Sequence, residues 1–383
     1  MKQLPALLLA LCLTFSTVPP ISAEIQSDPP LALSCASSVL MEKESGKILY
    51  QNNAHEKLEP ASVTKIMTLL LVMEAVAQGR LTLDEMVTVS SYASGMGGSQ
   101  VYLKEGEQMS VAEMIKCVTV VSGNDCAVAL AEHVAGSEAA FVSQMNQRAQ
   151  ELGMADTNFL NCTGLPAAGH LTSAHDIALM SRELILNHPS IRQYTTIWMD
   201  SIRDGTFGLT NTNRLIRFYP GATGLKTGST DGALYCMSAT AERDGMELIA
   251  VVMKAPTTAQ RFEDAKTLLD YGFANYALTQ IHPDSPLAPV DVLLGKTSQV
   301  QPRLSHSCNL LVSKGEQALV STKITLASSV EAPVEPGQTL GTLDVYVGDE
   351  LRDSVPIHAA QGVDRLTMPE IFTRLLRQLL MVS

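Results

Sequence analysis

The sequence Pro60-Ala61-Ser62-Val63-Thr64-Lys65 is followed directly by the apolar run Ile66-Met67-Thr68-Leu69-Leu70-Leu71-Val72-Met73. Proline is favoured at the start of a helix, and the run after it is apolar on nearly every side. We therefore expect a buried central helix that opens at Pro60 and ends at Gly79. Because Ser62 and Lys65 are three positions apart, such a helix places both side chains on one face, about one turn apart.

This pair of side chains is a candidate nucleophile and base. A serine hydroxyl is a poor nucleophile unless a neighbouring base accepts its proton. Lysine can be that base only if its pKa falls from about 10.4 toward about 7 to 8. Burial and a nearby cation both lower a lysine pKa, and Lys226 is the candidate cation. Ser-x-x-Lys alone is weak evidence, since it is expected about once by chance in a chain of this length.

A second motif, Ser122-Gly123-Asn124, lies at a break between two apolar helical stretches expected within residues 110–135. The Ser122 hydroxyl is placed to relay a proton toward a leaving amine. The Asn124 amide is placed to donate to a substrate amide and to Lys65. Taken alone, the tripeptide is far more typical of a turn that links two helices than of a catalytic motif.

A third motif, Lys226-Thr227-Gly228, opens an expected strand. A glycine there leaves room for a substrate backbone, and an extended peptide can pair along a strand edge. We expect Lys226 and Thr227 to bind a terminal carboxylate. We also expect the backbone N–H groups of Ser229 and Ser62 to form an oxyanion hole, in which one donor is worth about 3 kcal/mol of transition-state stabilisation.

The first residues read as a targeting segment. Lys2 is the only charge before Glu24, residues 7–15 are apolar, and Pro19-Pro20-Ile21-Ser22-Ala23 offers a cleavage site after Ala23. This pattern predicts a secretory signal peptide over residues 1–23, and a stable membrane anchor is the alternative. Cys12 does not indicate lipoprotein processing, because Leu11 stands before it where a small residue is required.

Composition restricts the remaining possibilities. A length of 383 residues, 46% of them hydrophobic and 17% charged, favours two well-packed domains over disorder. The formal net charge of -12 argues against a nucleic-acid partner. The sequence carries no phosphate-binding loop, no glycine-rich dinucleotide motif and no cluster of metal ligands. Six cysteines follow the signal segment, and we expect most of them to be buried thiols. They are Cys35, Cys117, Cys126, Cys162, Cys236 and Cys308.

The periodicity along the chain changes from mixed to all-β and then to a terminal helix. Residues 36–50 predict a strand pair, and residues 139–152, 172–186 and 261–278 predict helices. Residues 233–240 and 247–253 predict a hairpin, since an Asp-Gly turn joins them. After about residue 287, three short strands are expected, over residues 317–325, 342–347 and 354–359.

The C-terminal residues form one apolar stripe if they are helical. The stripe consists of Ile371, Phe372, Leu375, Leu376, Leu379 and Leu380. Arginines on the other face suit anionic headgroups, so we expect this helix to lie at a membrane surface. Docking of the helix on its own β domain is the alternative. The expected domains are therefore residues 24–285, a small all-β domain over residues 286–366, and an amphipathic helix over residues 367–383.

Three serine-hydrolase motifs in this order resemble those of low-molecular-mass penicillin-binding proteins, the serine D-alanyl-D-alanine carboxypeptidases. The resemblance covers nearly all of the chain after the signal segment. It is carried by Pro60-Ala61-Ser62-Val63-Thr64-Lys65, Val121-Ser122-Gly123-Asn124-Asp125, Asn161-Cys162-Thr163-Gly164-Leu165-Pro166 and Gly224-Leu225-Lys226-Thr227-Gly228. One departure is Asn161-Cys162-Thr163, where the family often has Asn-Pro, and there we expect a local backbone change.

The resemblance implies an α+β fold of the penicillin-binding and β-lactamase type, in which a helical cluster packs on an antiparallel sheet. It implies Ser62 as nucleophile, Lys65 as acylation base, and Ser122, Asn124 and Lys226 as relay and electrostatic partners. It further implies Arg261 as a carboxylate-binding residue. The implied enzyme is exported and needs no cofactor. It trims the terminal D-alanine from peptidoglycan stem peptides, and β-lactams inhibit it covalently.

Three other functions share some of these residues. A β-lactamase needs a base for rapid deacylation, but residues 157–163 contain no Glu or Asp. A transpeptidase or endopeptidase uses the same acyl-enzyme, so the sequence leaves that alternative open. A non-catalytic wall-binding or penicillin-sensing module would not need an activated serine, which Ser62, Lys65, Ser122 and Lys226 together predict.

Overall fold

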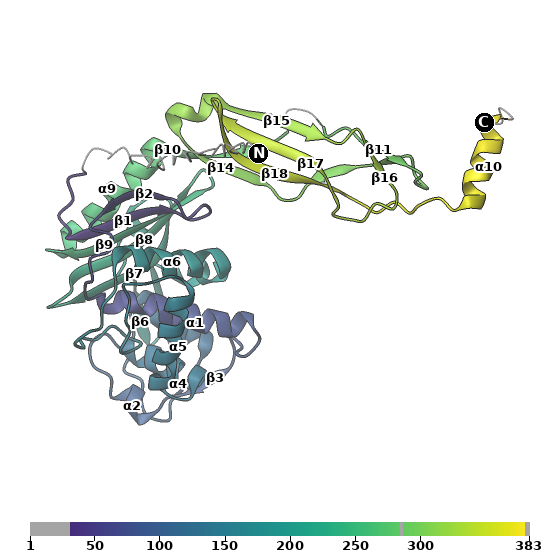
Figure 1. Ribbon diagram of the computed structural model, residues 1–383. Helices are drawn as coiled ribbons and strands as arrows, with labels where there is room; N and C mark the ends of the chain where they lie inside the picture. The colour runs from purple at the N-terminus through teal and green to yellow at the C-terminus, as the bar shows by residue number, and fades with distance from the viewer. Residues whose placement is uncertain (1–30, 284–285, 380–383) are drawn as a thin grey trace, which may run out of the picture. The chain divides into compact units, whose positions relative to one another are not determined.

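The computed structural model describes residues 31–283 and 286–379 of the chain. The predicted signal peptide, with Cys12, lies outside the described residues, and so does Leu380. The predicted α+β class is confirmed, because a mixed helix-and-sheet region is followed by an all-β region (Figure 1).

A five-stranded antiparallel sheet with the order β2-β1-β9-β8-β7 forms the frame of the first region. Its strands are β1 (Ser37–Glu42), β2 (Ile48–Asn52), β7 (Ala222–Thr230), β8 (Leu234–Arg243) and β9 (Met246–Ala255). The predicted strand pair and hairpin are both confirmed. β7 lies at the edge of the sheet, so one side of this strand makes no pairing within it.

Both faces of this sheet are buried, which explains why β1 and β9 read as continuous apolar runs. Val39 and Val251 belong to the hydrophobic core shared with the helical cluster. Leu40 and Leu248 point the other way, toward α9 (Thr258–Asn275). Gly272 of α9 lets this helix approach closely, since a Cβ there would lie 2.5 Å from Leu248 Cδ1.

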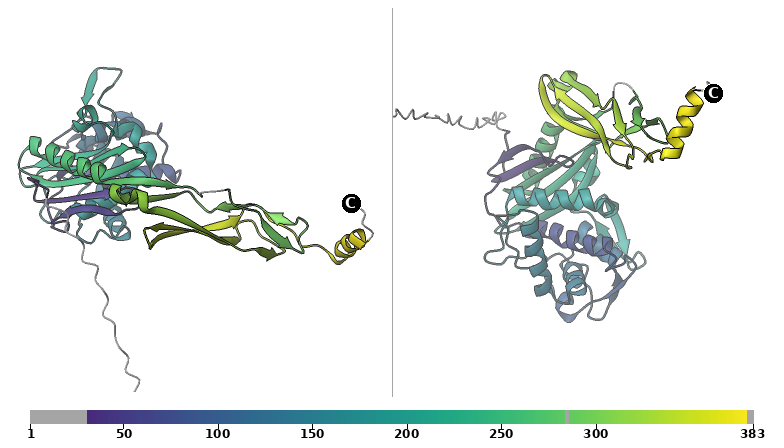
Figure 2. Two further views of the ribbon diagram at one scale, coloured as in Figure 1. Left: turned by 90° about the horizontal axis from the view of Figure 1, so that it is seen from above. Right: turned by 45° about the vertical axis from the view of Figure 1, so that its right-hand side comes forward.

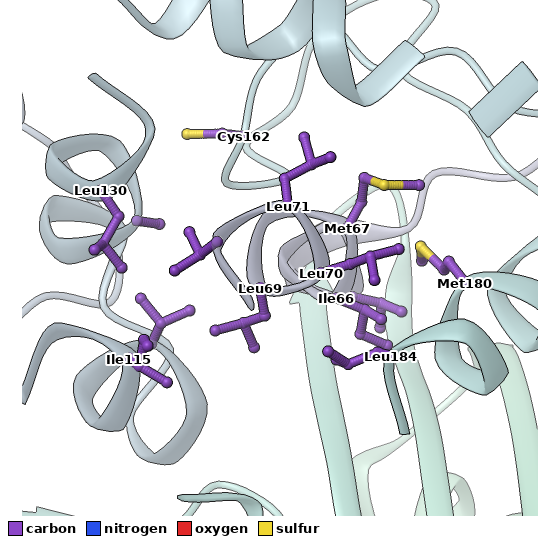
Figure 3. Close-up of a cluster of buried hydrophobic side chains, with 14 of the residues drawn as sticks. Ile66, Met67, Leu69, Leu70, Leu71, Ile115, Leu130, Cys162, Met180 and Leu184 are labelled. Carbon is purple, nitrogen blue, oxygen red and sulfur yellow. The ribbon is translucent and has the colours of Figure 1, made fainter. Parts of the chain in front are cut away.

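The helix α1 (Lys65–Ala77) runs through the middle of the helical cluster, as the sequence predicted. Figure 3 shows its apolar side chains surrounded by Ile115, Leu130, Cys162, Met180 and Leu184 from neighbouring segments. A short 3₁₀ helix, η1 (Ala61–Thr64), precedes α1, and Pro60 stands just before it. The six cysteines within the described residues are all buried and free, which confirms the prediction of buried thiols.

The other helices and short strands of this region complete the cluster (Figures 1 and 2). The helices are α2 (Ser91–Ser94), α3 (Val111–Val120), α4 (Asn124–Ala135), α5 (Glu138–Glu151), α6 (Ala174–Asn187), η2 (Pro189–Ile191), α7 (Arg192–Thr195) and α8 (Leu215–Phe218). The strands pair as β3 (Met86–Thr88) with β4 (Gln108–Ser110), and β5 (Met199–Ile202) with β6 (Phe207–Thr210). The predicted break between two helices at residues 122–124 is confirmed.

The helix predicted over residues 261–278 is shifted in the structure. It begins at Thr258, where Thr257 caps it, and it ends at Asn275. Residues 276–278 belong instead to β10 (Tyr276–Ile281), which pairs with β14 (Cys308–Ser313). Pairing with a distant strand therefore overrides the local helical pattern. We propose that the small β domain begins with β10, ahead of the boundary expected at residue 286.

The all-β region contains two hydrophobic cores of its own. One gathers valines such as Val290, Val300 and Val363, and the other gathers Leu343, Val345 and Ile357. Its further strands are β11 (Val290–Leu293), β12 (Gln299–Val300), β13 (Pro302–Leu304), β15 (Val320–Leu326), β16 (Ser329–Glu331), β17 (Thr339–Val347) and β18 (Glu350–Ala359). The strand predicted from residue 317 begins only at residue 320, because residues 314–319 form a 3₁₀ helix, η3 (Lys314–Leu319), closed by a Ser313–Glu316 capping box.

The C-terminal helix α10 (Met368–Leu379) forms as predicted. Phe372 and Leu379, two residues of the predicted apolar stripe, are 66% and 81% exposed. Within the described ranges, no helix is both long and apolar enough to cross a bilayer.

Candidate active site

The side chains of Ser62 and Lys65 are in direct contact. Ser62 lies in η1, and Lys65 is the first residue of α1. A 3₁₀ turn brings residues three apart onto the same face, and Lys65 Nζ lies 2.9 Å from Ser62 Oγ. The residue before the serine, Ala61, has a left-handed φ of 49°, a conformation that is costly for a residue with a Cβ. The nucleophile candidate therefore sits on a strained turn ahead of the buried helix.

Burial brings the pKa of Lys65 into the range in which a lysine can act as a base. Its side chain is 0% exposed, and this burial lowers its pKa to about 7. We expected the charge of Lys226 to lower the pKa of Lys65 as well, but burial alone is the cause that lowers it. The repulsion between the two lysines affects Lys226 instead. Burial, and then the charge of Lys65, lower the pKa of Lys226 well below its usual range.

A loop after α5 holds the Lys65 amine from the other side. Lys65 Nζ donates to the carbonyl oxygen of Thr163 at 2.7 Å. Asn161 Oδ1 fixes this loop by accepting from the backbone N–H groups of Thr163 and Gly164, at 3.1 and 2.7 Å. At Gly164, a Cβ would overlap the backbone carbonyl of Ala61. In the sequence this loop stands out only as a departure from the family pattern, and its contact with Lys65 was not predicted.

The second motif supplies two polar atoms that no protein group satisfies. Ser122 Oγ and Asn124 Oδ1 are buried and have no hydrogen-bond partner among the described residues. Ser122 has a φ of 65°, so its backbone is held in the left-handed region. Such buried, unsatisfied groups on a strained turn are typical of functional sites.

The Asn124 amide is used differently from our expectation. Its Nδ2 donates to the carbonyl oxygen of Gly97 at 2.7 Å, while the two hydrogen bonds of Lys65 go to Ser62 and Thr163. Asn124 thus anchors the loop around residue 97 rather than the lysine. The next residue, Asp125, accepts from the N–H groups of Val101 and Leu103, which fixes the far end of the same loop.

The third motif lies on β7, the edge strand. Lys226 and Thr227 are 1% and 5% exposed, whereas Ser229 is exposed. Lys226 Nζ donates to the carbonyl oxygen of Thr227 at 2.8 Å. The Thr227 hydroxyl lies 2.7 Å from that of Thr212, a residue that the sequence analysis did not single out.

Gly228 brings the third motif against the first. A Cβ on Gly228 would lie 2.8 Å from the backbone nitrogen of Ser62, and 2.9 Å from both Pro60 O and Val63 N. We had expected this glycine to make room for a substrate backbone. The structure gives a more local reason, since the turn that carries the serine occupies the space of the missing side chain.

Arg261 lies on α9 behind the third motif. Its Nη1 donates to the carbonyl oxygens of Gly228 and Cys236, at 3.3 and 3.5 Å. Its guanidinium also lies over the Phe262 ring, 4.7 Å from the ring centroid. Burial lowers the pKa of Arg261 to about 10, which leaves it charged at neutral pH. Arg261 thus places a positive charge beneath β7, close to the backbone of Gly228.

One carboxylate that the sequence analysis missed approaches the loop at residue 162. Glu138 Oε1 accepts from the backbone N–H of Cys162 at 3.0 Å, and its Oε2 accepts from the Tyr92 hydroxyl at 2.7 Å. Both oxygens are therefore engaged in holding neighbouring segments. Glu138 lies in the first turn of α5, outside residues 157–163, where the sequence shows no acid.

Comparison with known proteins places this chain in a family. A family model described as "D-alanyl-D-alanine carboxypeptidase" matches residues 23–257, which is more than half of the chain. This chain belongs to the D-alanyl-D-alanine carboxypeptidase family. A second model, "Penicillin-binding protein 5, C-terminal domain", matches residues 278–365, the region of the two small β cores.

Members of this family match between 64% and 95% of the chain. The chain is 40% identical to the D-alanyl-D-alanine carboxypeptidase DacF of Bacillus subtilis, over 95% of both chains. It resembles the crystal structure of penicillin-binding protein 5 from Haemophilus influenzae with a TM-score of 0.74 and 30% identity, covering 88% of this chain and all of that one. Penicillin-binding protein D2 from Listeria monocytogenes in its ampicillin-bound form matches 64% of this chain and all of its own, with a TM-score of 0.59 and 34% identity.

Proposed function

We propose that this member of the family is a serine-type carboxypeptidase that removes the terminal D-alanine from peptidoglycan stem peptides. The observation that carries the proposal is the 2.9 Å contact between Ser62 Oγ and the buried Lys65 amine, whose pKa is lowered to about 7. A neutral amine at that distance can accept the hydroxyl proton when the serine attacks.

Acylation begins with Ser62 Oγ attacking the carbonyl carbon of the penultimate D-alanine. Lys65 Nζ takes the serine proton, while its bond to Thr163 O keeps the nitrogen in place. The backbone N–H groups of Ser62 and Ser229 stabilise the oxyanion of the tetrahedral intermediate. The proton then passes by way of the Ser122 hydroxyl to the departing D-alanine nitrogen, so the peptide bond breaks and an ester on Ser62 remains.

Substrate recognition uses the edge strand and the charge behind it. The peptide backbone pairs along the free side of β7, and its terminal carboxylate lies against Lys226 and Thr227. A carboxylate there favours the charged form of Lys226, because an opposite charge raises a lysine pKa that burial and Lys65 lower in the free site. Arg261 adds positive charge from beneath the strand, and Asn124 Oδ1 is free to accept from a substrate amide.

Water then hydrolyses the ester, with Lys65 as the base that accepts its proton. A transpeptidase or endopeptidase would form the same acyl-enzyme, but the matching family and the relatives named above are carboxypeptidases. For β-lactams we propose stable acylation of Ser62 rather than turnover, because residues 157–163 carry no acid and both oxygens of Glu138 accept hydrogen bonds from Cys162 and Tyr92.

The proposed location is the outer face of the cytoplasmic membrane. Residues 1–23 carry the export signal, and the apolar stripe of α10 lies in the membrane interface. Arg374 and Arg377, on the same helix, add attraction to anionic headgroups. The small β domain then acts as a spacer between the membrane and the catalytic domain.

The central experiment measures D-alanine release from a diacyl-L-lysyl-D-alanyl-D-alanine peptide. Purified protein beginning at Glu24 should release D-alanine, and the Ser62→Ala variant should not. Release of D-alanine by both proteins would show that Ser62 is not the nucleophile. Labelling of Ser62 by penicillin without D-alanine release would favour a transpeptidase or endopeptidase. The absence of both labelling and release would overturn the catalytic assignment.

The membrane proposal has a separate test by co-sedimentation with vesicles. Protein lacking residues 367–383 should lose its binding to phosphatidylglycerol vesicles and keep its D-alanine release. A double Arg374→Glu, Arg377→Glu variant should bind these vesicles more weakly, with a smaller change on phosphatidylcholine alone. Undiminished binding of the truncated protein would show that another surface is responsible.

A further inference from the structure

Thr212 lies outside the three motifs but links the third motif to the end of α3, just before the second motif. It lies two residues after the end of β6, and its side chain is exposed. Its hydroxyl oxygen lies 2.7 Å from Thr227 Oγ1 in the third motif. Its backbone N–H donates to the carbonyl oxygen of Val120, two positions before Ser122, at 3.0 Å. One residue therefore contacts both the segment that leads to Ser122 and the threonine of β7.

Two buried asparagines hold Thr212 in this position. On one side, Asn211 Nδ2 donates to the carbonyl oxygen of Ile197 at 2.7 Å. On the other side, Asn213 Nδ2 donates to the carbonyl oxygen of Gly224, in β7, also at 2.7 Å. Asn211 Oδ1 accepts from the N–H of Asn213, which closes the turn around Thr212. The Thr212 hydroxyl is thus carried by a backbone that these hydrogen bonds fix.

The chemistry of the two hydroxyls sets the direction of their hydrogen bond. Each threonine hydroxyl has one proton to donate and can also accept. A carboxylate can only accept, so the proton of Thr227 must point toward a bound carboxylate. The hydrogen bond between the two threonine hydroxyls can then form only if Thr212 donates and Thr227 accepts. A donor that itself accepts a hydrogen bond is polarised and binds its acceptor more strongly.

We propose that Thr212 is a positioning residue for substrate recognition, which orients and polarises the Thr227 hydroxyl toward the terminal carboxylate of the peptide. Thr212 acts through Thr227, and Lys226 supplies the charge. The inference rests on the proposed function, since it takes Thr227 as a group that touches the carboxylate. It adds a residue outside the three motifs to the recognition of the substrate.

The test compares two variants at one position. Thr212→Val keeps the shape of the side chain and removes the hydroxyl, whereas Thr212→Ser keeps the hydroxyl. We expect the valine variant to raise the KM for the diacyl tripeptide by about tenfold, with kcat changed by less than about twofold. The serine variant should restore KM to within about twofold of the wild type. Equal melting temperatures of the three proteins serve as the folding control.

A double-mutant cycle with Thr227→Val separates positioning from a general structural role. If Thr212 acts through Thr227, the Thr212→Val change should have no further effect on KM when residue 227 is already valine. An effect that persists in the Thr227→Val background would overturn the proposal. An unchanged KM in Thr212→Val, or a serine variant as poor as the valine variant, would do the same.

Failure of the proposed function would be visible separately. If the wild type binds penicillin but releases no D-alanine, the same cycle is read on the second-order rate constant of acylation by benzylpenicillin, which also carries a carboxylate. Three results would then support the positioning role. Thr212→Val should lower this rate constant about tenfold, Thr212→Ser should restore it, and Thr212→Val should have no further effect in the Thr227→Val background. A wild type with neither activity would overturn both proposals.

Discussion

Lys65 Nζ lies 2.9 Å from Ser62 Oγ, and the lysine side chain is entirely enclosed by protein. The short turn before α1 sets the distance, and the apolar surroundings set the protonation of the amine. Both follow from the same stretch of chain, because the residues that make α1 a buried helix also bury its first residue. The reactivity of the serine is therefore tied to the packing of the core.

The pKa of Lys65 predicts how acylation depends on pH. The amine is the base only when neutral, so its active fraction rises as the pH passes through its pKa of about 7. We expect the acylation rate constant with benzylpenicillin to rise between about pH 6 and about pH 8 and then to level off. Stopped-flow or quench measurements across this range provide the check. A rate that rises only above about pH 9.5 would assign Lys65 an ordinary lysine pKa.

The same shift predicts how stability depends on pH. Between a folded pKa of about 7 and the ordinary value of 10.5, the unfolded chain binds more protons at Lys65 than the folded one. The free energy of unfolding therefore gains a contribution that rises with pH through this window, and below it the folded state carries a buried charge. We expect Lys65→Met to be more stable than the wild type. The gap between their free energies of unfolding should be largest at or below neutral pH.

Urea unfolding of both proteins at several pH values measures this gap. It should narrow steadily from neutral pH toward the ordinary lysine pKa. Taking the difference between the two proteins cancels groups that titrate alike in both. A gap that stays constant with pH would contradict the proton uptake assigned to Lys65.

Gly228 gives a prediction about close packing at the site. Its replacement by alanine puts a Cβ 2.8 Å from the Ser62 nitrogen, so the strand and the serine turn must move apart. We expect Gly228→Ala to lose about 1–3 kcal/mol of stability. Because even a small displacement of reacting groups is costly, activity should fall by roughly 100-fold.

Gly208→Ala is the matched control for this change. Gly208 is also a strand glycine, on β6, and a Cβ there would meet nothing within 4 Å. Thermal melting and D-alanine release should both stay near wild-type values in this control. Full activity in Gly228→Ala would show that the contact with the serine turn is dispensable.

Asn161 gives a prediction about the loop that holds Lys65. Its Oδ1 accepts from two successive backbone N–H groups, and removing it leaves both without that acceptor. We expect Asn161→Ala to lose about 1–3 kcal/mol of stability, and acylation should slow by about tenfold or more as Thr163 O shifts away from the lysine. Asn158→Ala is the control, since Asn158 makes a single exposed side-chain bond to Gly169 in the same loop. Equal acylation rates in the two variants would argue against this role of the loop.

The sequence predicted what depends on local pattern and missed what depends on distant packing. Ser62, Lys65 and Lys226 could be assigned because their motifs have a fixed spacing, and the burial of Lys65 followed from the apolar run after it. The role of Thr163 was not predictable in this way, because its contribution is a backbone carbonyl that any residue carries. The purpose of Gly228 depends on the turn at Ser62, which is distant in sequence.

The secondary-structure prediction failed at residues 276–278 for a related reason. Residues 276–278 continue a helical pattern, yet Tyr276 begins a strand because it pairs with Ser313. Thr212 was missed since Asn-Thr-Asn reads as an ordinary turn until β7 lies beside it. In both cases the deciding partner comes from a remote part of the chain, and no spacing within the segment signals it.

The central claim is that Ser62 is the residue that becomes acylated. Peptide mapping by mass spectrometry after incubation with benzylpenicillin tests it most directly. We predict a penicilloyl adduct on the peptide that contains Ser62, long-lived compared with the time of its formation, and no adduct in Ser62→Ala. An adduct on another residue, or an equal adduct in Ser62→Ala, would contradict the account.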